Sequence, residues 1–230
     1  DILLSFPHHP FKYIIDFLRE SSIDPAVRSI KMTIYRIGKN SNVINALINA
    51  ARNGKNVTVF MELQARFDEE TNIYWSTKLQ EEGVRVIHSI PGLKVHTKLI
   101  SVKRTEGKKS VYYTNIGTGN FNEYTASLYC DVSIMTADQT IGLETAQVFE
   151  MFEASYRSFS FKQLVVSPME MRPFIEGMID KLTESALRGE DSYAAIKLNN
   201  IVDKDIADKI YEAAQAGVKF DIICRSACVL

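Results

Sequence analysis

Short apolar runs rich in β-branched residues alternate along this chain with segments whose apolar residues recur at helical spacing. Residues 29–37 alternate in polarity and predict a strand, and residues 41–53 predict a helix that begins after Ser41 and ends before Gly54. The same reasoning predicts further strands at 56–63, 84–87, 95–103, 110–116 and 129–136, and further helices at 11–21, 68–82 and 138–154. Alternating strands and helices favour a layered α/β fold, because each helix must bury its apolar face against a sheet.

The strand and helix pattern starts again in the last third of the chain. Residues 168–188 predict a long helix, and strands at 193–198 and 218–224 flank a helix at 203–216. Between the two runs, residues 159–166 lack a periodic pattern and predict a connector.

The two runs also match each other in sequence. ALINAARNGKNVTVFM at 46–61 aligns with KIYEAAQAGVKFDIIC at 209–224 with an offset of 163 residues, and each has a glycine before its final strand. Upstream, Lys31 aligns with Lys197 after a three-residue gap. Any strand, helix, glycine and strand unit has this appearance, so a chance likeness stays open beside an internal duplication.

On the duplication interpretation, we expect one complete α/β domain over residues 1–155 and a truncated second domain over 156–230. The chain begins at Asp1 without a methionine and ends at Leu230 inside an apolar run that predicts a strand. We therefore expect a piece of a longer protein.

Composition excludes several classes of protein. Hydrophobic residues make up 46% and charged residues 24% of the 230 residues, which excludes disordered, collagen-like and coiled-coil chains. Lys and Arg total 27 against 28 Asp and Glu, so binding of a polyanion would need a local cationic cluster. Cys130, Cys224 and Cys228 fit neither a disulfide framework nor a zinc site, and we expect reduced thiols in a cytoplasmic protein. No apolar stretch reaches the ~18 residues of a membrane span, and no signal peptide is visible.

The chemistry of the chain concentrates in the run GLKVHTKLISV at 92–102. His96 and Lys98 are two residues apart on the strand predicted at 95–103, so we expect their side chains on the same face. A cation beside a histidine disfavours the imidazolium and leaves a neutral imidazole, which is a nucleophile. The cation could also neutralise phosphate oxygens. The pair favours transfer of a phosphoryl group through a phosphohistidine, although a single His-x-Lys is common and is by itself a weak signal.

A glycine-rich loop follows this pair. Residues 115–123 read NIGTGNFNE, and Gly117 and Gly119 would let backbone N–H groups approach an anion, with Asn120 beside them. A Gly-Thr-Gly run before a helix is more often a turn, so the loop alone is also weak evidence.

Together, the two motifs resemble the phospholipase D superfamily, in which two such halves build one site. The resemblance implies a mixed sheet flanked by helices, with the first half complete and the second truncated. The superfamily has an acidic residue five positions after the lysine, where this chain has Lys103.

Longer runs resemble one branch of that superfamily, the polyphosphate kinases. They are DILLSFPHHPF at the start, IKMTIYRIGKNS at 30–41, VFMELQARFDEE at 59–70, GLKVHTKLI at 92–100, NIGTGNFNEYTASLYCD at 115–131, TADQTIG at 136–142 and AAQAGVKFDIICRSACVL at the end. The resemblance covers the whole chain. It implies an enzyme that reversibly transfers the γ-phosphate of ATP to inorganic polyphosphate through a phosphohistidine, with Mg²⁺.

The resemblance also implies roles for individual residues. It implies that His96 is phosphorylated with Lys98 beside it, and that Asn120 belongs to the phosphate site. Further implied contacts with phosphate, magnesium or nucleotide are Arg36, Arg66, Tyr129 and, in the second half, Arg225. An arginine does not itself ligate a cation, so any link from Arg36 or Arg66 to Mg²⁺ runs through phosphate or water.

Arg36 and Arg66 also have support from their positions. Each lies at or just past the end of a predicted apolar strand, and strand ends in α/β sheets are where ligands gather. Two guanidinium groups that converge there would bind phosphate oxygens bidentately. With Lys94 and Lys98 they would form a cationic cluster around His96. The alternative is that both arginines pair with acidic residues nearby in the sequence.

Two other functions stay open: a phospholipase D-type phosphodiesterase or nuclease, and a non-catalytic polyanion-binding module. Lys103 and the polyphosphate-kinase-like runs around Arg36 and Arg66 disfavour the phosphodiesterase. The family's second histidine motif is expected beyond Leu230, so we expect the 230-residue chain to be inactive or nearly so.

The resemblance further implies a homo-oligomer that binds ATP and polyphosphate but no nucleic acid. It implies a cytoplasmic location with peripheral membrane association and no integral membrane segment.

Overall fold

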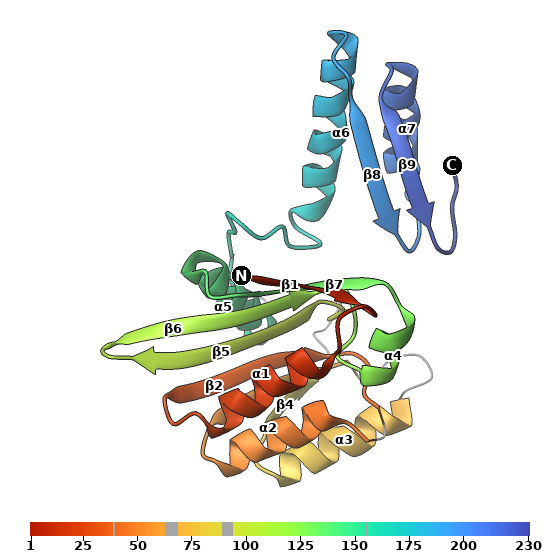
Figure 1. Ribbon diagram of the computed structural model, residues 1–230. Helices are drawn as coiled ribbons and strands as arrows, with labels where there is room; N and C mark the ends of the chain where they lie inside the picture. Colours follow the sequence, from red (N-terminus) through yellow and green to blue (C-terminus); the bar gives the residue numbers. More distant parts are fainter. Residues whose placement is uncertain (39, 63–68, 89–93, 155) are drawn as a thin grey trace. The chain divides into compact units, whose positions relative to one another are not determined.

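The computed structural model describes residues 1–38, 40–62, 69–88, 94–154 and 156–230. The chain divides into two compact units, unit 1 (Asp1–Leu164) and unit 2 (Val165–Leu230). Unit 1 contains a sheet with helices on both of its faces, and unit 2 contains a smaller sheet with its own helices (Figure 1). The α/β class predicted from the alternating pattern is confirmed.

The sheet of unit 1 is mixed. Among the described residues it has seven strands in the order β1-β7-β6-β5-β2-β3-β4. The strands are β1 (Ile2–Phe6), β2 (Val27–Ile34), β3 (Asn56–Met61), β4 (Arg85–His88), β5 (Lys98–Glu106), β6 (Lys109–Gly117) and β7 (Asp131–Thr136). β2, β3 and β4 are parallel, and the other neighbours are antiparallel. The ends of β2, β3 and β6 therefore lie at the same edge of the sheet as the starts of β5 and β7.

Helices cover both faces of this sheet. They are α1 (Lys12–Ile23), α2 (Asn42–Arg52), α3 (Glu69–Glu81), the short α4 (Glu123–Leu128) and α5 (Gln139–Glu153). α1, α2 and α3 lie on one face and α5 lies on the other (Figure 1). Met32 of β2 and Leu47 of α2 belong to the main core, and a fully buried side chain of this size contributes about 1.5–3 kcal/mol. On the opposite face, Phe60 of β3 packs against Phe149 of α5, with ring centres 5.4 Å apart.

The segment from β2 through α2 to β3 is a parallel strand, helix and strand unit with local end signals. Ser41 is the N-cap of α2, because its side-chain oxygen accepts a hydrogen bond of 3.3 Å from the backbone N–H of Ile44. Gly54 follows the helix with a φ of +76°, a left-handed conformation that glycine adopts at little cost. The predicted start and end of this helix are confirmed.

Unit 2 has the same arrangement. Its elements are α6 (Met171–Leu187), β8 (Tyr193–Leu198), α7 (Lys204–Gln215) and β9 (Lys219–Cys224). β8 and β9 are parallel, and Gly217 between α7 and β9 has a φ of +110°. Ile179 of α6 packs with Ile210 and Ala213 of α7 in a small core. None of the helices within the described ranges is both long enough and apolar enough to cross a membrane.

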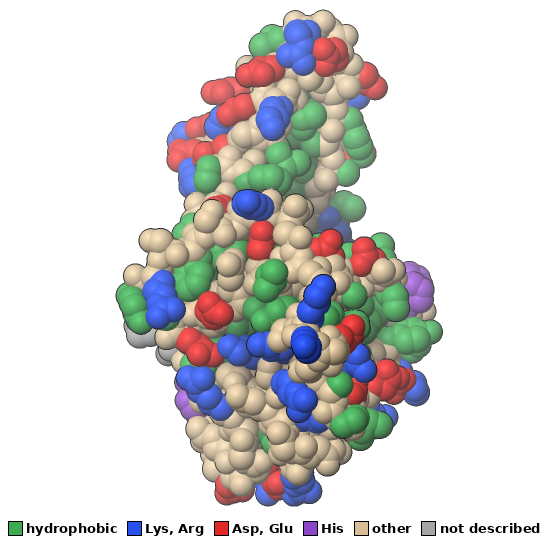
Figure 2. All heavy atoms as spheres, turned by 90° about the vertical axis from the view of Figure 1, so that its left-hand side faces the viewer, with side chains coloured by type: hydrophobic (Ala, Val, Ile, Leu, Met, Phe, Trp, Pro, Cys, Tyr) green, Lys and Arg blue, Asp and Glu red, His purple; other side chains and the backbone are tan. Residues whose placement is uncertain are grey.

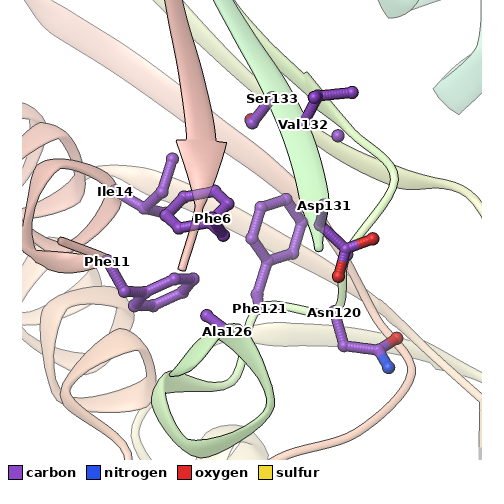
Figure 3. Close-up of a pocket in the computed structure, with 11 residues that line it drawn as sticks. Phe6, Phe11, Ile14, Asn120, Phe121, Ala126, Asp131, Val132 and Ser133 are labelled. Carbon is purple, nitrogen blue, oxygen red and sulfur yellow. The ribbon is translucent and has the colours of Figure 1, made fainter. Parts of the chain in front are cut away.

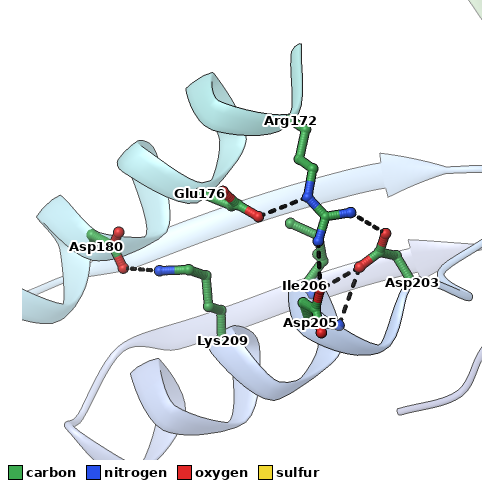
Figure 4. A network of polar contacts seen from close by, with 7 residues as sticks. All are labelled: Arg172, Glu176, Asp180, Asp203, Asp205, Ile206 and Lys209. Atoms are coloured by element: carbon green, nitrogen blue, oxygen red, sulfur yellow. Dashed lines mark hydrogen bonds and ion pairs between the residues drawn. The ribbon is translucent and has the colours of Figure 1, made fainter. Parts of the chain in front are cut away.

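Ion pairs join α6 to the start of α7 (Figure 4). The Arg172 guanidinium lies 2.9 Å from Glu176, 2.6 Å from Asp203 and 2.7 Å from Asp205. Asp203 is also the N-cap of α7, where it accepts hydrogen bonds from two backbone N–H groups. Exposed pairs of this kind contribute only about 0–1 kcal/mol each. The network therefore orients the two helices more than it stabilises them.

The strand register of the two sheets corrects the alignment of the two halves. Lys31 pairs with Thr58 in unit 1, and Ala195 pairs with Asp221 in unit 2. Thr58 and Asp221 are 163 residues apart, so the residue equivalent to Lys31 is Ala195. The alignment with Lys197 is wrong, because it matched identical side chains and not backbone pairing.

Two elements of unit 1 lie outside the sequence prediction. β1 obtains its order from five residue pairs with β7, a long-range contact without a local signal. α4 begins at the N-cap Asn122, whose side-chain oxygen accepts hydrogen bonds from the Tyr124 and Thr125 backbone N–H groups. A helix of six residues is too short for a periodic pattern to be visible.

The turn between β5 and β6 is shorter than residues 104–109, the interval left between the two predicted strands. β5 pairs with β6 as far as Glu106 and Lys109, and Gly107 between them has a φ of +60°. Arg104 lies within β5 and pairs with Asp24 and Glu106, each at 2.8 Å.

On the face of unit 1 seen in Figure 2, Lys and Arg side chains gather with Asp and Glu side chains among them.

Candidate active site

His96 and Lys98 lie at the edge of the sheet where β2 ends and β5 begins. β5 starts at Lys98, so His96 precedes the strand and does not lie on it as predicted. The two side chains still meet, because Lys98 Nζ lies 3.1 Å from His96 Nδ1 and donates a hydrogen bond to the His96 carbonyl oxygen. The contact arises from the irregular segment before β5 and not from the two-residue period of a strand.

Thr33 near the end of β2 shapes this irregular segment. Its hydroxyl group donates a hydrogen bond of 2.8 Å to the Thr97 carbonyl and accepts one of 2.9 Å from the Leu99 N–H. The Thr33 hydroxyl thus takes the place of backbone hydrogen bonds between β2 and the residues on both sides of Lys98. The backbone at His96 is therefore not part of β5.

Lys98 is buried, with 5% of its surface exposed. Burial is the main cause that lowers the pKa of Lys98 to about 8; within this net value the Asp131 carboxylate acts to raise the pKa and the Arg36 guanidinium acts to lower it. The ammonium group is therefore still mostly protonated at pH 7, but it is less strongly held in the charged form than an exposed lysine.

The His96 imidazole is neutral near pH 7. Partial burial of the ring lowers its pKa, and the charges of Lys98, Lys94 and Arg36 lower the pKa further. The residue as a whole remains exposed, so a substrate has access to the ring. A neutral, accessible imidazole among cations is suited to nucleophilic attack on an anionic phosphate.

Arg36 lies just past the end of β2, where the sequence predicts it. Its guanidinium carbon is 5.9 Å from the centre of the Tyr35 ring. Tyr35 also contacts His96 edge to face, with ring centres 4.7 Å apart and ring planes at 78°. One aromatic ring therefore brings Arg36 and His96 together. Sequence analysis does not single out Tyr35, and its place beside Arg36 at a strand end is the signal that could have found it.

The glycine-rich loop leads from β6 to α4. The Thr118 N–H donates a hydrogen bond of 2.9 Å to the Val132 carbonyl of β7, so the expectation that this loop offers its backbone N–H groups to an anion is wrong for Thr118. A Cβ atom on Gly119 would lie 2.5 Å from Asp131 Oδ2. Gly119 therefore makes room for the Asp131 side chain.

Asn120 and Asp131 lie together on the wall of a small cavity of about 10 Å³. Figure 3 shows both side chains on the side away from the rings of Phe6 and Phe121. The side-chain oxygen of Asn120 is buried and has no hydrogen-bond partner among the described residues. The structure thus places Asn120 beside Asp131, whose charge acts on Lys98.

Comparisons with known proteins identify the family of this chain. The family described as polyphosphate kinase C-terminal domain 1 matches residues 1–158, and polyphosphate kinase C-terminal domain 2 matches residues 164–230. The chain belongs to the polyphosphate kinase family.

Curated relatives of the polyphosphate kinase family are similar over the whole chain. The identity is 48% with polyphosphate kinase of Klebsiella pneumoniae, 47% with that of Escherichia coli K12 and 50% with that of Vibrio parahaemolyticus, each over 230 residues. Each comparison covers 100% of this chain and 33% or 34% of the relative. The chain therefore spans about a third of the length of these relatives.

Solved structures extend the comparison to the fold. The crystal structure of polyphosphate kinase from Porphyromonas gingivalis aligns with a TM-score of 0.88 at 36% identity, over 100% of this chain and 38% of that chain. NucT from Helicobacter pylori aligns with a TM-score of 0.51 at 15% identity, over 67% of this chain and 95% of that chain. The likeness to NucT concerns the fold alone.

The other residues implied by the polyphosphate kinase resemblance have different placements. Arg66 lies outside the described residues. Tyr129 is the C-cap of α4 and is 46% exposed, two positions before Asp131. Arg225 follows β9, where its Nε donates a hydrogen bond of 2.9 Å to the Asn199 side chain, and it is placed only within unit 2.

Lys103, the departure from the phospholipase D pattern, also lies on β5. Lys98 and Lys103 are five residues apart on one strand, so their side chains point to opposite faces of the sheet. The ammonium group of Lys103 lies 5.9 Å from the centre of the Tyr112 ring. An acidic residue at this position would point to the face of the sheet opposite Lys98.

The side chains around His96 do not fit direct magnesium binding. The described residues contain no group of three or more His, Cys, Asp or Glu that could hold a metal ion. The charged groups that act on His96 are the cations Lys98, Lys94 and Arg36. Mg²⁺ prefers carboxylate, water and phosphate oxygens, so this site offers it little without a bound phosphate.

Proposed function

We propose that this chain carries the phosphohistidine site of a polyphosphate kinase that reversibly transfers the γ-phosphate of ATP to inorganic polyphosphate. The observation that carries the proposal is the neutral imidazole of His96, in contact with Lys98 and within the field of Lys94 and Arg36. Membership of the polyphosphate kinase family supports the overall activity, and the chemistry of the four side chains supports the histidine step.

The proposed reaction has two steps. A ring nitrogen of His96 with a free lone pair attacks the γ-phosphorus of ATP; the N–P bond forms, the P–O bond to ADP breaks, and the ring releases its proton. A terminal oxygen of polyphosphate then attacks the same phosphorus, the N–P bond breaks, and the ring takes up a proton. The reverse sequence makes ATP from ADP and polyphosphate.

The surrounding residues have supporting roles in this proposal. Lys98, Lys94 and Arg36 would stabilise the negative charge of the transferred phosphoryl group. The family resemblance supports Asn120, Arg66, Tyr129 and Arg225 as contacts of phosphate or nucleotide. Magnesium has no assigned step, because the side chains around His96 do not fit it.

We further propose that the 230-residue chain is inactive or nearly so by itself. It spans about a third of the length of its relatives. Catalytic groups that act as a unit lose most of their effect when one is missing. Residues 1–155 and 156–230 would be the first and second phospholipase D-like domains, the second one incomplete, of a homo-oligomeric enzyme.

The test incubates γ-labelled ATP and Mg²⁺ with a protein of the relatives' length that contains this sequence. We expect an acid-labile, alkali-stable label on His96 that is lost in His96→Ala. His88→Ala is the matched control, because His88 is an exposed histidine at the end of β4 that contacts Ser76. Equal labelling of His96→Ala would overturn the proposal.

Other outcomes of the same assay identify the alternative functions. Hydrolysis of a phosphodiester substrate without ATP would support a phosphodiesterase. Polyphosphate binding without any label would support a non-catalytic binding module. Polyphosphate synthesis by the 230-residue chain at the rate of the longer protein would refute its predicted inactivity.

A further inference from the structure

A single aromatic ring lies among the cationic groups of the His96 site. The centre of the Tyr35 ring is 5.3 Å from Lys94 Nζ, 5.4 Å from Lys98 Nζ and 5.9 Å from Arg36 Cζ. The His96 ring packs against the same tyrosine at 4.7 Å. Four groups that act on the phosphate site therefore share one neighbour.

Such a cluster needs something that offsets its mutual repulsion. A cation within about 6 Å of the centre of an aromatic ring is attracted by the electron-rich face of the ring. Carboxylates supply part of this, because Asp131 acts on Lys98 and Glu62 acts on Lys94, but each further negative charge would compete with a bound phosphate. A neutral ring holds the cations close together and leaves their charge available for a polyanion.

Tyr35 is itself held in place by buried contacts. Its backbone carbonyl accepts a hydrogen bond of 3.0 Å from the side-chain amide of Asn72 on α3. The same amide donates a hydrogen bond of 2.8 Å to the Glu62 carbonyl after β3, and Asn72 is fully buried. The ring therefore extends from a fixed strand end, and its edge-to-face contact with His96 restrains the plane of the imidazole.

We propose that Tyr35 is a positioning residue that holds Lys94, Lys98, Arg36 and His96 ready for a linear polyphosphate through the electrostatics of its ring. The inference rests on the proposed function of the His96 site. Tyr35 acts through its neighbours and does not itself react.

The test separates the electrostatics of the ring from its shape. Tyr35→Phe is compared with variants that carry one, two and three fluorine atoms on the same phenylalanine ring, and calorimetry measures tripolyphosphate binding to a protein of the relatives' length that contains this sequence. Fluorine weakens the negative face of the ring and changes its volume little. Lys94 also forms a hydrogen bond with the Tyr35 side chain, and every phenylalanine variant lacks this bond, so Tyr35→Phe is the reference for the series. Relative to Tyr35→Phe, we expect the affinity to fall stepwise with each fluorine, by about tenfold with three fluorines.

Each outcome bears on a different statement. Binding that requires Lys98 but is equal across the fluorinated series would overturn the role of Tyr35 and leave the His96 site standing. Absence of tripolyphosphate binding by the wild-type chain, or binding unchanged in Lys98→Met, would count against both.

A second measurement reads the position of the imidazole directly. The Tyr35 ring current shifts the proton NMR signal of His96 Cε1–H. We expect this shift to persist in Tyr35→Phe and to disappear in a folded Tyr35→Leu variant. A wild-type signal position in Tyr35→Leu would contradict the proposal.

Discussion

The hydroxyl group of Thr33 donates a hydrogen bond of 2.8 Å to the carbonyl oxygen of Thr97, a residue 64 positions later in the chain. The same hydroxyl accepts a hydrogen bond from the Leu99 N–H. A threonine of β2 therefore holds the backbone on both sides of Lys98. The local geometry of the His-Thr-Lys motif depends on a residue of another strand.

Thr33→Val tests this dependence. The substitution keeps the shape of the side chain but leaves the Thr97 carbonyl and the Leu99 N–H without their partner. Buried polar groups without partners cost about 1–3 kcal/mol, so we expect the free energy of unfolding to fall by roughly 2 kcal/mol in urea denaturation. Thr33→Ser keeps the hydroxyl group and is the matched control. Equal losses in the two variants would show that the hydrogen bonds are not responsible.

The titration of His96 tests the electrostatics of the site. Burial and the charges of Lys98, Lys94 and Arg36 lower the pKa of His96 below 6.5, so proton NMR should record a midpoint below that value. Lys98→Met removes one of these cations and should raise the midpoint. As the pH falls, the histidine of the unfolded chain takes up its proton at a higher pH than His96 of the folded chain does. The folded state should therefore lose stability as the pH falls below about 6.5. A midpoint at or above the ordinary value in the wild type would refute this assignment.

Lys98 should reduce the stability of the folded chain at neutral pH. Its pKa falls from 10.5 to about 8 on folding, so the unfolded state holds the proton more tightly. Replacing Lys98 by Met should raise the free energy of unfolding at pH 7 by up to about 3 kcal/mol. The gain in stability of Lys98→Met over wild type should shrink as the pH rises from about 8 to 10.5. In this range the wild-type lysine loses its proton on folding, and the cost of losing it falls as the pH rises.

The control for this variant is Lys103→Met, which removes a charge from a less buried position on the same strand. We expect it to change stability less than Lys98→Met does. A Lys98→Met variant that is less stable than wild type at pH 7 would mean that the contacts of the ammonium group outweigh its burial.

Glu144 of α5 should hold the end of unit 1 in place. Its buried carboxylate accepts four hydrogen bonds of 2.8–3.2 Å from the backbone N–H groups of Lys162, Gln163 and Leu164. Burial acts to raise the pKa of Glu144, but these backbone hydrogen bonds outweigh it and lower the pKa below 4.5. Glu144→Gln places an N–H donor against these donors and should cost roughly 2–3 kcal/mol.

The pH dependence gives this variant a second readout. The wild-type chain should lose stability as the pH falls through the lowered pKa of Glu144, because the carboxylate must then take up a proton. Glu144→Gln should lack this part of the acid transition. Glu150→Gln changes an exposed carboxylate on the same helix and serves as the control. Identical urea and acid curves for the two variants would remove the special role of Glu144.

The sequence predicts much of the fold because many of its signals are local. Hydrophobic periodicity, the Ser41 cap and Gly54 identify α2 and its flanking strands. The same kind of signal fails for β1, whose order depends on pairing with β7, a strand more than a hundred residues away in the chain. It also misplaces the start of β5. The Thr33 side chain takes the place of backbone pairing between β2 and β5 near Lys98, so the strand does not extend back to His96.

The sequence by itself determined the α/β class and the likeness of the two halves, and it singled out a histidine, a lysine and arginines for the proposed phosphate site. These depend on residue type and short-range spacing. Only the tertiary structure decided that Lys98 is buried, that Asp131 lies beside Gly119, and that Tyr35 joins His96 to three cations. Each of these depends on contacts between strands distant in sequence, and desolvation and ring electrostatics act only once such contacts exist.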